Sequence, residues 1–217
     1  MSLTLGILVS GRGSNLQALM DATCTADYPA RIGLVLSNRP GVQALERATV
    51  AGIPTAVIDH RDFEDRPAFE KAMDARLRKA GVRLVCLAGF MRVLTPWFVE
   101  RWQDRLVNIH PSLLPAFPGL DTHRRALEAG VRFAGCTVHF VRPAVDDGPI
   151  VVQAAVPVLP DDDEATLAAR VLEAEHRAFP LAVRLIAEGR VTIRGARAEV
   201  RGITTSAAPV LNPPDTE

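Results

Sequence analysis

Residues 3–19 read LTLGILVSGRGSNLQAL: a short apolar run that ends at Ser10, a turn of small and polar residues, and then an amphipathic pattern. The apolar run is typical of a buried β-strand, and Leu16, Leu19 and Met20 recur at the spacing of one helix face. A strand that leads directly into a helix is the first unit of an alternating α/β fold. Glycines in the connecting turn allow positive φ and a close approach of a ligand to the backbone.

The same alternation continues through the first half of the chain. Further strands are expected at 31–38, 55–59, 83–90 and 105–110, with helices over 41–52, from Asp65 to about Gly81, and from a Thr95-Pro96 cap to Trp102. This spacing predicts an α/β fold with a doubly wound, mostly parallel sheet, in which ligands bind at the carboxyl ends of the strands. Because GRGSN, GFMR and NIHP fall at such ends, we expect three polar loops to converge at one edge.

The second half departs from this pattern. Residues 136–141 and 149–158 are expected to form strands that face each other across the loop RPAVDDG, an antiparallel addition to the sheet. A long helix is expected within 161–189, and Pro180 should kink or break it. Its predicted buried face consists of Leu167, Val171, Ala174, Ala178 and Leu181. Residues 191–202 suggest a small hairpin.

We expect residues 1–204 to form one domain, with an N-terminal half of about 1–104 and a C-terminal half of about 105–204. Residues 205–217 are short and rich in proline, so disorder is expected there.

The composition excludes several classes of function. The chain of 217 residues has 25 Lys and Arg and 25 Asp and Glu, so no overall field attracts nucleic acid or an anionic membrane. Cys24, Cys86 and Cys136 are widely spaced, which argues against a disulfide framework and against a metal site of the zinc type. The first apolar stretch is too short to cross a bilayer and lacks a preceding basic segment, which favours a cytoplasmic location.

The GRGSN turn alone supports two interpretations equally. Ser14 and Asn15 can cap the helix that follows, while its first N–H groups remain free for an anion such as a phosphate monoester. A plain capped turn fits the same residues. The full GxGxxG spacing is missing and no GK[ST] follows, so neither a dinucleotide site nor a Walker loop is supported.

A second stretch makes the chemistry specific. Residues 108–115 read NIHPSLLP, and VDDGPI follows at 145–150. Together with GRGSNLQAL, GFMRVLTP and FPGLDTHRRALEAG, these motifs resemble the folate-dependent formyltransferases, and among them the enzymes that formylate phosphoribosylglycinamide (GAR). The likeness runs from about residue 3 to residue 190. It implies a Rossmann-like formyltransferase fold and formyl transfer from 10-formyltetrahydrofolate to the GAR amine in de novo purine biosynthesis, without a metal.

The proposed catalytic residues also make chemical sense. Asn108 and His110 are two apart on a strand and project to one face, where an amide can stabilise an oxyanion and an imidazole can move a proton between amines. The resemblance, rather than the spacing, pairs His110 with Asp146, whose carboxylate would raise the imidazole pKa. Taken alone, NIHP fits a structural histidine better than a catalyst. No motif supports a catalytic role for the other four histidines, which are His60, His123, His139 and His176.

The resemblance further assigns the binding residues and makes the first half the phosphate-binding half and the second the folate-binding and catalytic half. For GAR these are Gly13, Ser14, Asn15, Leu172, Glu173, Ala174 and Glu175, with Glu175 on the ribose hydroxyls. For the folate they are Arg66, Met91, Arg92, Val93, Leu94, Asn108, Arg142, Pro143, Ala144, Val145 and Asp146. Arg66 is placed near the folate's glutamate, and the loop 142–146 is expected to close over the pterin. Asp147 departs from the expected pattern, because it adds a charge beside Asp146.

Rival functions share parts of this pattern. Methionyl-tRNA formyltransferase is expected to carry a further basic C-terminal domain, and formyltetrahydrofolate hydrolase an N-terminal regulatory one. A nucleotide-binding module would bind phosphorylated ribosides without turnover, and a nicotinamide oxidoreductase would need the fingerprint spacing of glycines. The intact set of Asn108, His110 and Asp146 favours the formyltransferase. The sequence leaves monomer and homodimer both open.

Overall fold

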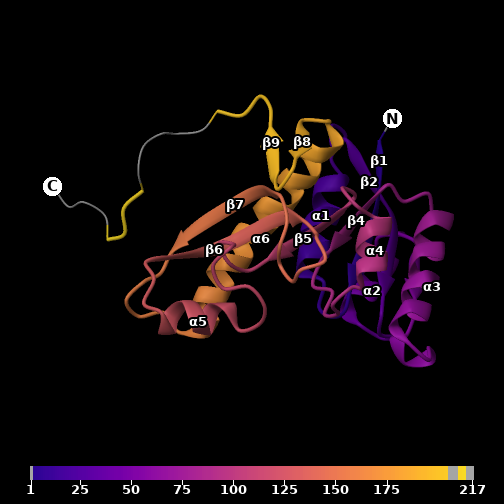
Figure 1. Cartoon of the computed structure of the whole chain (residues 1–217), viewed down its shortest axis with the longest axis horizontal. Coiled ribbons are helices and arrows are strands. Elements are labelled where there is room, and N and C mark those ends of the chain that lie inside the picture. Colours follow the sequence, from indigo (N-terminus) through magenta and orange to yellow (C-terminus); the bar gives the residue numbers. More distant parts are fainter. Residues whose placement is uncertain (1, 205–209, 214–217) are drawn as a thin grey trace.

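The computed structural model describes residues 2–204 and 210–213 (Figure 1). Seven strands form one sheet in the order β3-β2-β1-β4-β5-β6-β7. The strands are β1 (Leu3–Val9), β2 (Ala30–Ser37), β3 (Thr55–Val57), β4 (Leu84–Leu87), β5 (Leu106–His110), β6 (Phe133–Phe140) and β7 (Ile150–Pro157). The expected terminal hairpin is present as β8 (Val191–Arg194) and β9 (Arg197–Val200).

The sheet changes direction at β5. Strands β1 to β5 pair in parallel, whereas β6 runs antiparallel to both β5 and β7. The predicted fold class, a mostly parallel α/β sheet with an antiparallel addition, is therefore confirmed. Asn108 of β5 stands opposite Leu87 of β4 on one side and His139 of β6 on the other. Two of the catalytic candidates, Asn108 and His110, thus lie on the strand that pairs with both β4 and β6.

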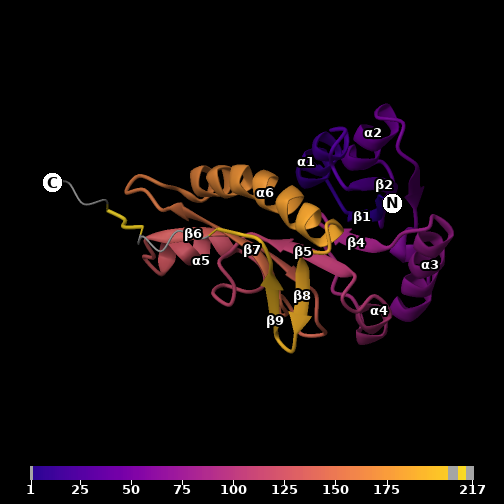
Figure 2. The ribbon, with the colours of Figure 1, turned by 90° about the horizontal axis from the view of Figure 1, so that it is seen from above.

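Helices cover both faces of the sheet (Figure 2). They are α1 (Ser14–Thr23), α2 (Gln43–Val50), α3 (Arg66–Lys79), α4 (Pro96–Arg101), α5 (Thr122–Glu128) and α6 (Glu164–Ala187), with a short 3-10 helix η1 (His60–Asp62). Leu16, Ala44 and Val171 belong to a core on the face covered by α1, α2 and α6. Phe69 and Phe98 belong to a second core on the opposite face, under α3 and α4. This two-sided burial is what a doubly wound sheet requires.

Several local predictions need correction. The buried face of α6 does not include Leu181, which is 47% exposed, and continues instead through Ala182 and Leu185. The expected spacing drifted because a straight helix has 3.6 residues per turn rather than 3.5. Pro180 does not break α6, since the helix runs on to Ala187. Buried neighbours on either side, Phe179 and Ala182, pack into the core and hold the helix across the missing backbone donor.

Thr95 and the segment after NIHPSLLP also differ from expectation. Thr95 occupies the N-cap position of α4, but its side chain makes no capping bond, because the hydroxyl donates to the buried carboxylate of Glu70. Helix α5 was not predicted. It lies in the motif FPGLDTHRRALEAG and buries only Thr122 and Ala126, so its apolar pattern is weak.

Two further sequence predictions concern the C-terminal tail and membrane-spanning segments. Residues 205–209 and 214–217, which belong to the tail expected to be disordered, lie outside the described residues. Over 2–204 and 210–213, none of the helices combines the length and the apolar character that crossing a membrane requires.

Candidate active site

His110 lies at the end of β5, with both ring nitrogens beside acceptor groups. The side chain is almost buried, and its Nδ1 lies 3.3 Å from Oδ1 of Asp146. The other nitrogen, Nε2, lies 3.0 Å from the carbonyl oxygen of Phe117. A carbonyl oxygen only accepts, so this contact places a proton on Nε2. The position of Asp146 beside Nδ1 agrees with the sequence prediction that this residue faces His110.

The two groups that face His110 come from residues with uncommon backbone conformations. Phe117 has φ 52° and Asp146 has φ 51°, values that non-glycine residues adopt rarely. Asp146 is held further by the backbone N–H of Gly119, which donates to its Oδ2 at 2.7 Å. Left-handed residues of this kind gather at functional sites, where the surroundings fix them. The loops at 117–119 and 146 thus fix the imidazole between them.

Asn108 is oriented by a histidine on the neighbouring strand. His139 is 1% exposed, and its Nδ1 lies 3.2 Å from the carbonyl oxygen of Phe140, which places the proton on Nδ1. Burial lowers the pKa of His139, which favours the neutral ring. Its Nε2 is then free to accept from the amide Nδ2 of Asn108 at 3.3 Å. The amide nitrogen of Asn108 keeps a second N–H for a ligand.

A cavity of about 710 Å³ opens beside these groups. This volume lies within the range of small-molecule sites in proteins. The cavity is lined by ten of the eleven residues that the sequence assigned to the folate: Met91, Arg92, Val93, Leu94, Asn108, Arg142, Pro143, Ala144, Val145 and Asp146. Arg66 is the exception, because it lies on the exposed start of α3 and is not part of the lining. The guanidinium of Arg92, by contrast, stands 5.9 Å over the ring of Phe69 and borders the cavity.

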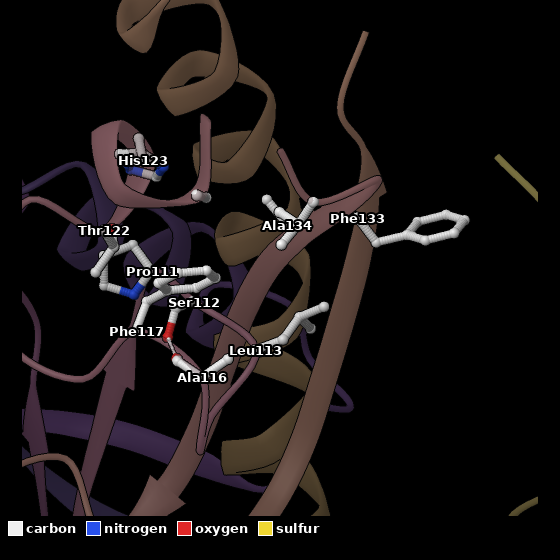
Figure 3. A pocket seen from close by; sticks show the side chains of 11 residues that line it. Pro111, Ser112, Leu113, Ala116, Phe117, Thr122, His123, Phe133 and Ala134 are labelled. Carbon is white, nitrogen blue, oxygen red and sulfur yellow. Dashed lines mark hydrogen bonds between the residues drawn. The ribbon is translucent and has the colours of Figure 1, made fainter. Parts of the chain in front are cut away.

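A second, smaller cavity is lined by the segment that follows β5 and by the start of α5 (Figure 3). It measures about 100 Å³ and shares Pro111, Thr122 and His123 with the larger cavity. In Figure 3 the hydroxyl of Ser112 reaches the carbonyl oxygen of Ala116, a hydrogen bond of 2.6 Å that closes the turn before Phe117. The smaller cavity is therefore lined by the same turn whose Phe117 carbonyl oxygen contacts His110.

The GRGSN turn is built as an open helix start. Gly13 is the N-cap of α1 with φ 75°, and no side chain caps the helix. A Cβ on Gly13 would lie 2.7 Å from the Cβ of Ala44, so only glycine fits there. The capping expected of Ser14 and Asn15 is absent in this part of the structure, since α1 itself begins at Ser14. Uncapped N–H groups at a helix start favour the anion site over the plain capped turn.

The start of α1 is joined to α6 by a buried polar pair. The amide Nδ2 of Asn15 donates to Oε2 of Glu175 at 2.7 Å, across 160 positions of sequence. Glu175 is 6% exposed, and burial raises its pKa. The Oδ1 atom of Asn15 is buried without a hydrogen-bond partner among the described residues. The neighbours Leu172, Glu173 and Ala174 lie on the same stretch of α6.

The formyl transferase family model matches residues 4–183 of this chain. The chain belongs to the formyl transferase family. This formyltransferase is 41% identical over 198 residues to phosphoribosylglycinamide formyltransferase of Haemophilus influenzae, covering 91% of this chain and 93% of that protein. Its structure resembles that of glycinamide ribonucleotide transformylase 1 from Symbiobacterium toebii, with a TM-score of 0.89, 48% identity, and coverage of 92% and 94%.

The formyltransferase also resembles one part of much longer proteins. It is 54% identical over 191 residues to the trifunctional purine biosynthetic protein adenosine-3 of Drosophila melanogaster. That match covers 87% of this chain but 14% of the longer protein.

The motifs predicted Asn108, His110 and Asp146, which the structure brings together, but they did not predict the groups that orient them. His139 had no catalytic case in the sequence, yet it contacts the amide of Asn108. Its position directly opposite Asn108 depends on the register of β5 and β6, which alternation within one strand does not give. The Phe117 carbonyl group was also missed, because a backbone acceptor leaves no signal in the sequence.

Proposed function

We propose that the formyltransferase moves a formyl group from 10-formyltetrahydrofolate to the amine of phosphoribosylglycinamide, the GAR transformylase step of de novo purine biosynthesis. The observation that carries the proposal is the meeting of Asn108, His110 and Asp146 at the wall of a cavity large enough for a folate. The uncapped start of α1 at the same edge of the sheet supports a phosphorylated acceptor.

The two substrates take different parts of the site. The pterin of the folate lies along Met91–Leu94, and the loop 142–146 closes over it. The phosphate of GAR binds the N–H groups at Gly13–Asn15, and the carboxylate of Glu175 accepts hydrogen bonds from the ribose hydroxyls. Leu172–Ala174 complete this side of the acceptor site. Arg66 is kept as a prediction for the glutamate end of the folate, although it lies outside the cavity lining.

The reaction is an acyl transfer between two amines. The GAR amine attacks the formyl carbon, a C–N bond forms, and the oxygen gains negative charge that the free N–H of Asn108 stabilises. Collapse of this intermediate breaks the bond to N10 and releases tetrahydrofolate and formyl-GAR. One proton must leave the attacking amine and one must reach N10. Because Nε2 of His110 is bound to the Phe117 carbonyl, this proton exchange falls to Nδ1, next to Asp146.

The proposed reaction uses no metal ion. Neither the attack nor the proton transfer needs a metal, and over 2–204 and 210–213 no three His, Cys, Asp or Glu side chains gather in a way that could hold one. A cytoplasmic location and the choice between monomer and homodimer stay predictions.

The decisive experiment is a formyl-transfer assay with 10-formyltetrahydrofolate and GAR, followed by the absorbance of the folate, with a control that omits GAR. We expect turnover that depends on GAR and is strongly reduced by His110→Ala. Folate cleavage without GAR would show a hydrolase instead. Binding of both compounds without turnover would show a module that only binds, and the catalytic roles would be withdrawn.

A further inference from the structure

Ser10 lies between the two substrate sites and bonds in three directions. It is the last residue before the GRGSN turn and is only 5% exposed. Its backbone N–H donates to the carbonyl oxygen of Gly89 at 3.1 Å. Its hydroxyl donates to Oδ1 of Asn38 at 2.6 Å and accepts from the backbone N–H of Met91 at 2.9 Å. One side chain thus joins the end of β1, the end of β2 and the first residue of the folate loop.

Each of the two sites also has a support that the other lacks. In the GRGSN turn, the carbonyl oxygen of Gly11 accepts from the N–H of Ala44, and that of Arg12 accepts from Nε of Arg47, both at 3.1 Å. These contacts come from α2 and do not reach the folate loop. At the far end of that loop, the N–H of Thr95 donates to Oε1 of Glu70 at 2.8 Å, and the hydroxyl of Thr95 donates to Oε2 of the same carboxylate.

The Ser10 hydroxyl is the direct side-chain link between the turn and the loop. Asn38, its acceptor, is 1% exposed, so the pair lies in a buried environment where an unpaired polar group is costly. Removing the hydroxyl would leave the N–H of Met91 and Oδ1 of Asn38 without this partner. Asn38 and the first residue of the folate loop would each lose a fixed contact with the residue directly before the phosphate turn.

We propose that Ser10 is a positioning residue shared by the two substrate sites. Its hydroxyl fixes the position of the phosphate turn relative to the folate loop. The proposal rests on the proposed assignment of the turn to the phosphate of GAR and of the loop to the folate. Ser10 itself touches neither substrate in this proposal, so its loss weakens binding more than it slows the chemical step.

The test is steady-state kinetics of three variants that each delete one hydroxyl. Ser10→Ala is expected to raise KM for both substrates by about threefold to tenfold, with kcat within about twofold of the wild type. Thr95→Val changes only the far end of the loop and is expected to raise KM for the folate alone. Ser37→Ala is the matched control: Ser37 is also buried at the end of β2, but its hydroxyl bonds only to Arg39, so neither KM should change.

The outcomes separate the proposal from the proposed function. If Ser10→Ala raises KM for the folate alone, or for neither substrate, the shared role is wrong, while GAR-dependent turnover by the wild type still supports the function. Wild-type protein without GAR-dependent turnover would instead remove the basis of both. Ser10→Cys, which keeps the volume but bonds weakly through sulfur, replaces Ser10→Ala if that variant does not fold, and the same pattern of KM values is required of it.

Discussion

At the scale of single residues, the position of His110 depends on two backbones that adopt left-handed conformations. Phe117 presents a carbonyl oxygen and Asp146 presents a carboxylate, each with φ near 50°. A non-glycine residue in this region costs about 1–3 kcal/mol, which the rest of the fold must offset. The imidazole is thus oriented before any substrate binds, and little reorganisation is left for the reaction.

Replacement of either ionisable partner should therefore affect turnover far more than folding. We expect His110→Ala and Asp146→Asn each to lower kcat by about 10²- to 10⁴-fold, because proton transfer between the amines loses its mediator. Circular dichroism and thermal unfolding should show a native fold in both. Loss of folding, or turnover at the wild-type rate, would contradict the assigned roles.

Glu175 makes stability depend on pH in a defined direction. Burial raises its pKa, so the folded state holds the proton more tightly than the unfolded chain. The associated stability is complete below the unfolded pKa and is lost as the pH rises through the folded one. Wild-type protein should thus lose stability from about pH 4.5 upward relative to Glu175→Gln. Urea unfolding over a pH series measures this difference.

The control for this prediction is Glu173→Gln, which removes an exposed carboxylate from the same helix. Its stability relative to the wild type should hardly change with pH. If Glu175→Gln and Glu173→Gln gave parallel curves, burial of the Glu175 carboxylate would have no role in the pH dependence.

At the scale of elements, helix α6 begins with a capping box. The side chain of Asp163 accepts from the N–H of Thr166 at 2.8 Å, and the hydroxyl of Thr166 bonds back to the N–H of Asp163. Asp163→Ala should lower the free energy of unfolding by about 0.5–2 kcal/mol. Asp161→Ala removes an exposed carboxylate two residues earlier and is the matched control. Equal stability of the two variants in chemical denaturation would show that the cap contributes nothing.

The elements also show how far the sequence could be read. The strands and the longer helices could be predicted from apolar periodicity and from the Gly and Pro residues at their ends. Each of these elements has an apolar face that is buried in the core. Helix α5 buries only Thr122 and Ala126, so periodicity could not reveal it. The shift from Leu181 to Ala182 arose from extending a spacing of 3.5 over several turns. Partners across strands, such as His139 for Asn108, require the three-dimensional register.

At the scale of the whole molecule, one sheet runs through both halves of the chain, because β5 of the C-terminal half pairs with β4 of the N-terminal half as well as with β6. The prediction that residues 1–204 form a single domain stays a prediction, and calorimetry can test it. We expect a single unfolding transition with equal calorimetric and van't Hoff enthalpies. Two resolved transitions would show that the halves unfold separately.

Ligand binding should raise the Tm of the whole unfolding transition, because the Asn15–Glu175 pair joins α1 to α6. Ribose 5-phosphate at a hundred times its Kd should stabilise the native state by about 2.7 kcal/mol. Asn15→Ala should reduce the shift in Tm at the same concentration. An unchanged Tm on addition of the ligand to the wild type would contradict the placement of the phosphate at the GRGSN turn.

Asn15 and Glu175 lie 160 positions apart in the sequence, so the ribosome makes the two members of this pair at different times. When the first 160 residues have been synthesised, the strands of the seven-stranded sheet and the proposed catalytic residues Asn108, His110 and Asp146 have been made. Helix α6, which carries the carboxylate opposite Asn15, has not yet been made. A chain of this length contains the proposed catalytic residues but only part of the proposed acceptor site. In the proposed function, the acceptor site is therefore completed after the catalytic residues, when α6 is added.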